Sequence, residues 1–394
     1  MKPSPNIVLV SPGAHYPAHM WTNTVELMRA LEKNNQNVRA IIFSTTTEPI
    51  PSDLRDRVES VFIRTPLEKG TAGRWQERRF GALINAIETV ACLFKAFLKS
   101  KRKTKTILHF VGGSYWVVML GALFFRRFHF VCSVYGPILS GGSSGLKGKI
   151  RPLMRKFVRQ ALVTDRLDLV FETELIYDDL APQYGKHIHI IHYGIDDSIK
   201  LVSQSEARRE LNLPPDEKII LFFGTHRREK DYHTSLKGCM ALLNPPLALF
   251  VGKVISSNDP QQVVADCHYP KSFIVNDFVA DEKIKYYFAA SDVVALPYEA
   301  AFSKGSGVLI ECCRYIRPVI VSATPYFTSF LTRYQCGVSY IPSDSASFAK
   351  AVAQVLADGE AFRDGLEQVR SAYSWKAIAG QYIKIYNGKD AGLN

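Results

Sequence analysis

Short apolar runs separated by helix-length amphipathic segments make up the first half of the chain. Strands are predicted over residues 6–10, 38–43, 60–64, 106–111, 128–134, 167–172 and 188–192. Most of these runs are apolar throughout, which is typical of strands buried on both faces of a parallel sheet. The first run is followed by Ser11-Pro12-Gly13 and an amphipathic segment over residues 20–34. Strand, glycine turn, helix and strand predict the opening unit of a doubly wound α/β sheet.

The same pattern starts again after residue 200. Strands are predicted over residues 218–223, 247–251, 272–276 and 292–297, and helices over residues 233–243, 281–290 and 345–358. A chain of 394 residues suits two domains of roughly 150–200 residues each. We therefore predict two Rossmann-like domains with parallel sheets that face a central cleft, and a boundary near residue 200. In open α/β sheets, ligands bind at the carboxyl ends of the strands.

Positive charge is concentrated in the first half. The net charge is +12, of which residues 1–200 contribute +11, with 28 Lys and Arg against 17 Asp and Glu. The surplus gathers at residues 95–105, 126–127 and 147–159, each beside Leu, Phe or Met, and a predicted helix over residues 77–100 carries an apolar stripe. Cations beside apolar side chains suit an anionic bilayer surface. We hypothesise peripheral binding to the inner face of the cell membrane; a merely solvated basic surface is the alternative.

Other features of the composition indicate the compartment. The seven cysteines include no CxxC pair and no Cys/His cluster at zinc spacing, which fits a reducing cytoplasm. The N-terminus lacks the apolar core of a signal peptide, and the most apolar run, residues 115–125, is about half as long as a bilayer span. We expect a cytoplasmic protein. No nucleic-acid-binding module is recognised, so nucleic acid is not an expected partner.

Two loops of the second half could hold an anion. The loop 224–230, GTHRREK, follows a predicted strand and carries Arg227, Arg228 and Lys230. A leaving diphosphate needs its growing charge met by fixed cations and N–H groups, although basic residues are also common in solvated turns. The loop 303–307, SKGSG, lies between a buried strand and a helix that begins Val-Leu-Ile-Glu311. Backbone N–H groups at such a helix end suit a phosphate, and Glu311 can accept two vicinal hydroxyls.

Four stretches of the second half together resemble glycosyltransferase family 4, which has the GT-B fold. In order they are GTHRREK, NDFVADEKIKYYFAASDVVALPYE, SKGSGVLIECCRYIRPVIVS and, near the C-terminus, SWKAIAGQYIKIY. The first half matches more loosely, through its strand–glycine–helix opening, RLDLVFETE and HYGIDD. The resemblance implies an acceptor-side domain over residues 1–200, a nucleotide-sugar domain over residues 201–375, and a final helix over residues 376–394 that packs back toward the first domain.

The resemblance also implies a reaction. A hexosyl group would pass from a nucleoside diphosphate-sugar to an acceptor hydroxyl with retention at the anomeric carbon, the donor being a substrate and no cofactor being needed. A glycan or lipid-linked acceptor is expected. The residues implied for the donor diphosphate are Gly13, Arg227, Arg228, Lys230, Gly305, Ser306 and Gly307. Those implied for the nucleoside are Leu309, Ile310 and Glu311, with Glu311 on the ribose hydroxyls.

The catalytic positions depart from the family pattern. The first glutamate of the E-x7-E motif is Ser303 here, and Glu299, four residues upstream, is the candidate to replace it. The family's acceptor-side histidine falls where this chain has Tyr135; His109 is a nearby alternative, although a lone histidine in a strand is more often structural. The arginine that normally follows the loop glycine is Thr225, so its charge is expected at Arg227 or Arg228.

Metal independence and two other functions complete the interpretation. No Asp-x-Asp triplet occurs, and metal-dependent diphosphate chemistry usually needs paired carboxylates. We therefore expect no bound metal. A nucleotide-sugar 2-epimerase shares the two-domain layout and would need no acceptor. A non-catalytic sugar-nucleotide-binding subunit would bind the nucleotide without turnover, as the serine at position 303 would allow.

Overall fold

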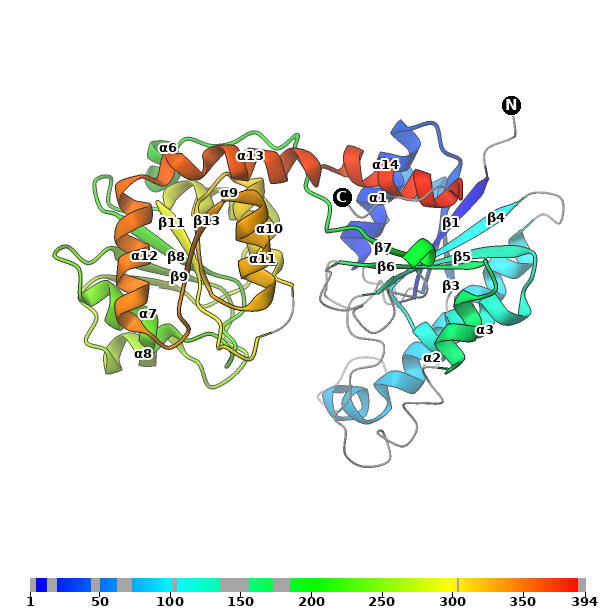
Figure 1. Ribbon diagram of the computed structural model, residues 1–394, viewed down its shortest axis with the longest axis horizontal. Helices are drawn as coiled ribbons and strands as arrows, with labels where there is room; N and C mark the ends of the chain where they lie inside the picture. Colours follow the sequence, from blue (N-terminus) through cyan, green and yellow to red (C-terminus); the bar gives the residue numbers. More distant parts are fainter. Residues whose placement is uncertain are drawn as a thin grey trace. The chain divides into compact units, whose positions relative to one another are not determined.

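The chain divides into two compact units, each built around one parallel sheet (Figure 1). The computed structural model describes residues 5–12, 20–43, 50–61, 73–100, 105–134, 156–172, 185–302 and 305–388. The first unit is Met1–Gly194 with Trp375–Asn394, and the second is Ile195–Ser374. The Trp375 ring lies so close to Gly194 that a Cβ there would be 2.3 Å from Cδ2 of the indole. This contact joins the last helix to the first unit.

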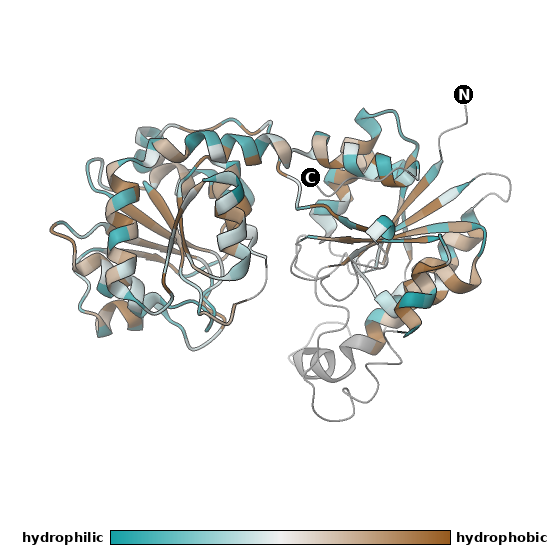
Figure 2. Ribbon diagram, viewed as in Figure 1, coloured by the Kyte–Doolittle hydropathy of each residue, from teal (hydrophilic) through white to brown (hydrophobic). Residues whose placement is uncertain are grey.

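The first sheet contains seven parallel strands in the order β3-β2-β1-β4-β5-β6-β7. They are β1 (Asn6–Ser11), β2 (Val38–Phe43), β3 (Val58–Val61), β4 (Thr106–Val111), β5 (Phe128–Val134), β6 (Leu167–Phe171) and β7 (Ile188–Ile190). The order reverses between β1 and β4, which is the switch point of a doubly wound sheet. The strands are coloured largely brown in Figure 2, as expected when both faces are covered.

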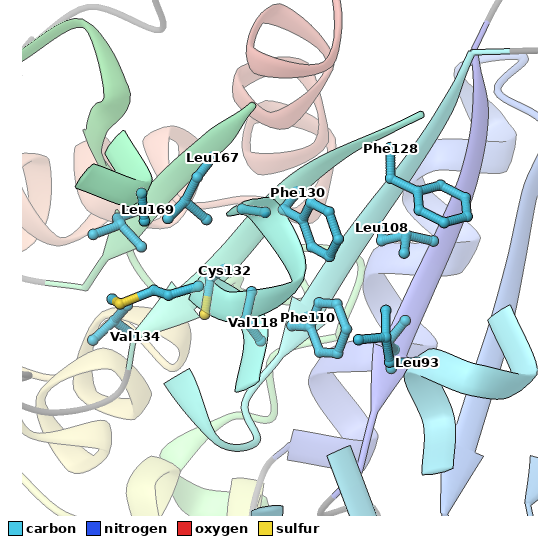
Figure 3. Packing of buried hydrophobic residues seen from close by; sticks show 14 of the residues in the cluster. Leu93, Leu108, Phe110, Val118, Phe128, Phe130, Cys132, Val134, Leu167 and Leu169 are labelled. Atoms are coloured by element: carbon cyan, nitrogen blue, oxygen red, sulfur yellow. The ribbon is translucent and has the colours of Figure 1, made fainter. Parts of the chain in front are cut away.

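Helices cover both faces of this sheet. They are α1 (Met20–Lys33), η1 (Ser52–Arg57), α2 (Gly73–Lys99), α3 (Tyr115–Phe124), η3 (Gly185–His187) and α14 (Trp375–Tyr386). One apolar cluster joins the sheet to α1 and α14, and a second joins it to α2 and α3. Figure 3 shows the second cluster, in which Phe110 and Phe130 stack with their ring centroids 6.2 Å apart. The two clusters pack against opposite faces of the sheet and hold its strands in place.

Only part of the apolar surface of helix α2 is buried in the core of the first unit. Cys92, Leu93 and Ala96 enter the core. Several side chains of the apolar stripe predicted from the sequence are exposed, among them Val90 at 52% and Phe94 at 61%. An apolar hollow of about 550 Å³ lies along these side chains, between α2 and Val61. In the part of the chain that the structure describes, no helix is both long and apolar enough to cross a membrane.

The second sheet has six parallel strands in the order β10-β9-β8-β11-β12-β13. They are β8 (Ile219–Phe223), β9 (Leu247–Val251), β10 (Ser272–Val275), β11 (Val293–Leu296), β12 (Val319–Ser322) and β13 (Gly337–Tyr340). Its switch point lies between β8 and β11. The segments that follow these two strands, 224–230 and 297–302, therefore leave the sheet side by side.

Nine helical segments flank the second sheet within the described residues. They are α6 (Gln204–Glu210), α7 (Tyr232–Met240), α8 (Pro260–Asp266), α9 (Asp281–Ala290), α10 (Gly307–Arg314), α11 (Pro325–Tyr334), α12 (Ser345–Ala357), η4 (Gly359–Phe362) and α13 (Arg363–Ala372). The side chains of Asp231, Asp259 and Asp344 cap α7, α8 and α12, each satisfying a backbone N–H that the helix leaves free. Helix α10 has no such side-chain cap at its first residue.

Candidate functional site

Two loops meet at the switch point of the second sheet. The backbone of Lys230 pairs with that of Tyr298 in an antiparallel bridge, and the Glu299 N–H donates to the Glu229 carbonyl at 2.8 Å. The loop after β8 is thereby tied to the loop after β11. A Cβ placed on Gly224 would lie 3.3 Å from Cγ2 of Val308, on the first turn of α10. The basic loop and the start of α10 therefore lie against each other.

Gly224 makes this close approach possible. Its φ is +85°, which is in the left-handed region that favours glycine. A Cβ on Gly224 would also be 3.8 Å from Lys230 Nζ. A side chain at position 224 would thus be strained, would crowd Val308 and would touch Lys230.

Lys230 is the most unusual cation of the site. Its side chain is 5% exposed, and Nζ donates to the Phe223 carbonyl at 2.8 Å. Burial, reinforced by the nearby charge of Arg227, lowers the pKa of Lys230 to about 7. A lysine with only carbonyl partners in a dry position is costly to keep charged. A dianion bound beside this loop would offset the cost of keeping Lys230 charged. Lys230 is therefore suited to binding a phosphate.

The remaining basic side chains of the loop differ in exposure. Arg227 and Arg228 are both exposed, and Arg227 Nε donates to Thr225 Oγ1 at 3.0 Å. His226, between them and the strand, is fully buried and its Nδ1 is 2.7 Å from the Tyr232 hydroxyl. The two arginines are free to turn toward a ligand, whereas His226 supports the loop from the core.

The start of α10 presents backbone N–H groups. Ser306 is the N-cap residue but makes no side-chain cap hydrogen bond, and no acidic residue occupies the first turn. Gly307 is exposed, and a Cβ added there would meet nothing within 4 Å. Gly305 is half-buried. A helix end without a side-chain cap and beside open space has the geometry that suits an anion.

Glu311 lies one turn into α10. Its carboxylate oxygens are 3.3 and 3.4 Å from Nη1 of Arg314, which also approaches Asp196 at 4.0 Å. The Glu311 side chain is 28% exposed, so it is partly accessible from solvent. A carboxylate at this position can accept hydroxyl hydrogen bonds.

Leu309 and Ile310 lie on the buried side of the same helix. Leu309 is fully buried and Ile310 nearly so, and both anchor α10 to the core of the second unit. Their predicted packing beneath a nucleotide stays a prediction.

The candidate catalytic residues are only partly described. Glu299 is exposed and follows the segment that pairs with the basic loop, whereas Ser303 lies outside the described residues. Gly13 and Tyr135 of the first unit also lie outside them.

His109 occupies a different environment from that of an acid or base that meets a substrate. It is fully buried in β4, with Nδ1 2.7 Å from the Tyr386 hydroxyl and Nε2 2.9 Å from Ser133 Oγ. Burial lowers its pKa to about 3. Both ring nitrogens are occupied by protein groups, so the structural role weighed from the sequence is favoured over the acceptor-side role.

Two features of the first unit were not singled out from the sequence. Gly112 and Gly113 follow β4 with φ of +86° and +98°, and a Cβ on Gly113 would lie 3.0 Å from Cγ of Pro12. A second glycine turn therefore packs against the Pro12 turn at the switch point of this sheet. Glu172, at the carboxyl end of β6, has its pKa raised to about 8 by burial. The signal for the turn was the Gly-Gly pair directly after a buried strand.

Within the described part of the chain, no group of three or more His, Cys, Asp or Glu side chains is arranged to hold a metal ion. The cations and N–H groups named above are the groups available to meet a diphosphate.

Comparisons with known proteins agree with this geometry. Residues 203–370 match the family model described as glycosyl transferases group 1. D-inositol 3-phosphate glycosyltransferase 1 of Catenulispora acidiphila is 22% identical over 243 residues, which cover 57% of this chain and 58% of the relative. The corresponding enzyme of Corynebacterium urealyticum is 23% identical over 256 residues, 60% of each chain. The chain thus spans about three fifths of the length of these curated relatives.

Solved structures match the whole chain. Sucrose-phosphate synthase from Thermosynechococcus elongatus gives a TM-score of 0.69 at 20% identity over 97% of this chain and 98% of the other. Anabaena HepE, solved in complex with UDP, gives 0.67 at 13% identity over 97% and 99%. These likenesses concern the arrangement of both sheets. The chain therefore has the GT-B fold, and residues 203–370 match the family model of glycosyl transferases group 1.

Proposed function

We propose that the protein is a retaining glycosyltransferase that moves a sugar from a nucleoside diphosphate-sugar to an acceptor hydroxyl. The observation that carries the proposal is the junction of the basic loop after β8 with the uncapped start of α10, one turn before Glu311. A site for an anion at the start of α10, with a carboxylate one helical turn later that can accept two hydroxyls, matches the diphosphate and ribose of a nucleoside diphosphate.

The donor diphosphate is assigned to the loop and the helix end. Backbone N–H groups of Gly305, Ser306 and Gly307 donate to the oxygens of one phosphate, and Lys230 with Arg227 or Arg228 balances the charge of the other. Charge grows on the leaving diphosphate as the glycosidic bond breaks, so groups fixed before the reaction lower its barrier. Lys230 contributes most after the nucleotide excludes water from it, because charge interactions strengthen in a dry site.

The nucleoside and the sugar are assigned to neighbouring positions. Glu311 receives the ribose hydroxyls, and Glu299 or Ser303 faces the sugar near the anomeric carbon. A carboxylate or hydroxyl at that point stabilises the positive charge that develops on the sugar. The family pattern supports retention of anomeric configuration.

We also propose that the transfer needs no divalent metal. The cations of residues 227–230 and the α10 end supply the charge that a metal would otherwise supply. Excess EDTA should leave the transfer rate unchanged, and restoration of an EDTA-treated enzyme by manganese would refute this part of the proposal.

The acceptor is proposed to be a lipid-linked or membrane-borne glycan reached from the cytoplasmic side. The support is the exposed apolar side of α2, where Leu83, Ile87, Val90, Phe94 and Leu98 face solvent. Lys95 and Lys99 lie on the same helix, and each approaches only Glu59 among the described carboxylates, at 3.8 and 3.5 Å. Apolar side chains flanked by lysines fit an anionic bilayer surface, at about 1 kcal/mol per cation.

Sedimentation with anionic vesicles tests the membrane contact. The double variant Val90→Asp/Phe94→Asp should bind vesicles more weakly than the native chain, because two carboxylates would have to enter the interface. Leu243→Asp is the matched control, since Leu243 is 97% exposed on the second unit. Equal sedimentation of native and double-variant protein would refute the role of α2.

A thermal-shift screen tests the donor. Because HepE was solved with UDP-glucose, UDP-sugars are the first to try, followed by GDP-, ADP- and dTDP-sugars. Binding to the native state should raise the melting temperature by mass action. Release of the nucleoside diphosphate only when an acceptor is present would separate transfer from 2-epimerisation. No stabilisation by any of the four donors would overturn the proposal.

A further inference from the structure

A second pocket of the second unit lies on the opposite edge of the sheet from the donor site. It has a volume of about 420 Å³, and its lining includes Lys218, Asp292 and Pro318. These residues immediately precede β8, β11 and β12, which run parallel to one another. The pocket is therefore at the amino ends of the strands, whereas Gly224 and α10 follow their carboxyl ends. Its size lies within the range of small-molecule sites.

The pocket carries more positive than negative charge. Four cations line it, Lys218, Lys285, Arg317 and Arg363, against the carboxylates of Asp292 and Glu360. Both carboxylates are already engaged. Asp292 accepts from Arg208 Nη2 at 2.9 Å and from the Ile219 N–H at 2.8 Å, and Glu360 pairs with Arg363.

Arg317 and Lys285 form no direct ion pair with a described carboxylate. Nε of Arg317 is buried with no hydrogen-bond partner in the described structure, and no described carboxylate lies within ion-pair distance of either side chain. Burial lowers the pKa of Arg317, yet a guanidinium stays charged at neutral pH. Arg317 as a whole is half-buried, and the charges of Asp292 and Glu360 act on it from nearby, so the buried Nε is the group that a ligand would satisfy.

The backbone beside Arg317 is also under strain. Ile316, the preceding residue and part of the pocket wall, has a φ of +53°. A β-branched residue in the left-handed region is an outlier that persists only where the surroundings hold it. The strained turn presents Arg317 at the pocket. Apolar side chains, among them Val202, Ala289 and Leu356, form another part of the wall.

We propose that this pocket binds a small organic phosphate. Arg317 offers a planar fork that matches two phosphate oxygens, and Lys285 supplies the second charge of a dianion. The apolar wall receives the carbon portion of the ligand. The site is distinct from the donor site and does not depend on the identity of the sugar nucleotide.

Calorimetric titration of the full chain with two probes tests the pocket. Phenyl phosphate should bind more tightly than inorganic phosphate, because its ring meets the apolar wall. Arg317→Met and Lys285→Met should each weaken phenyl phosphate binding about tenfold or more, the usual worth of a charge-assisted contact. Lys237→Met, an exposed lysine on α7, is the matched control and should bind as the native chain does.

The donor site is a second control, because it also attracts phosphates. In the double variant Arg227→Ala/Arg228→Ala the binding of phenyl phosphate at the pocket should persist. Loss of binding in that variant, or unchanged binding in Lys285→Met and Arg317→Met, would overturn the proposal. Absence of binding to the native chain at millimolar probe would overturn it as well. If Arg317→Met does not fold, Lys285→Met decides, because Lys285 lies on the separate helix α9.

Discussion

The titration of Lys230 gives a distinctive signature for the donor site. In the free protein its pKa is about 7, because the side chain is buried against the Phe223 carbonyl. Only the protonated amine attracts a diphosphate. Affinity for the nucleoside diphosphate should therefore decrease as the pH rises above 7, in a range where no ordinary lysine titrates.

The size of the effect follows from the protonated fraction. With a pKa of about 7, that fraction falls about 25-fold between roughly pH 7.5 and pH 9. A charge-assisted contact is worth about 1.5–3 kcal/mol, so the loss of affinity should level off between about tenfold and a hundredfold. The phosphates of the ligand are already ionised over this range, so they contribute little to the slope.

Calorimetry of the nucleoside diphosphate over this pH range measures the effect. Lys230→Met keeps the length of the side chain and removes the charge, so its affinity should be low and independent of pH. Lys237→Met should keep the native profile. A native affinity that is flat up to about pH 9 would refute a ligand contact by a lysine of depressed pKa.

Whereas nucleotide affinity should fall with rising pH, the same lysine should make the free energy of unfolding rise with pH. Its pKa is lowered on folding from 10.5 to about 7, so the unfolded chain binds more protons between these values and the free energy of unfolding rises with pH there. Lys230→Met should consequently be more stable than the native chain near neutral pH, with a difference that shrinks toward alkaline pH. A chemical denaturation series at several pH values checks this; a difference that grows with pH would contradict the sign.

Three further predictions concern neighbouring residues. Glu311→Gln should weaken nucleoside diphosphate binding by about tenfold, measured by calorimetry, because the amide is a poorer partner for two ribose hydroxyls; Glu367→Gln on α13 is the control, and equal affinities would argue against the ribose contact. Gly224→Ala should lower the melting temperature, since a φ of +85° costs an L-residue about 1–2 kcal/mol; an unchanged melting temperature would contradict the strain. Gly307→Ala should fold normally, because its Cβ would point into open space, yet bind the nucleotide less tightly; full affinity would place the diphosphate elsewhere.

Both sheets could be predicted from the sequence because most of their strands are apolar runs. Runs such as residues 6–10 and 218–223 cannot be covered except by helices on both faces. Strand β13 (Gly337–Tyr340) was not predicted. It lies at the edge of its sheet with only Tyr340 buried, so it lacks the continuous apolar pattern.

The orientation of α2 could not be predicted for a different reason. A hydrophobic stripe predicts which side of a helix avoids water, but not whether the protein or a membrane covers it. Val90 and Phe94 face outward, while Cys92 and Leu93 enter the core. The choice depends on the shape of the space beneath the helix.

Motifs located the candidate donor site, but they did not reveal the environment of each residue. The glycine and basic loops could be placed at strand ends from their order along the chain. The burial of Lys230 and the two hydrogen bonds of His109 depend on segments distant in sequence, such as Tyr298 and Tyr386. No local pattern contains these contacts.

A crystal structure of the protein with the nucleoside diphosphate selected by the thermal-shift screen tests the central claim most directly. The diphosphate should contact the N–H groups of residues 305–307 and Nζ of Lys230, with both ribose hydroxyls on the Glu311 carboxylate. A nucleotide bound anywhere else on the second unit, or one whose ribose leaves Glu311 paired only with Arg314, would contradict it.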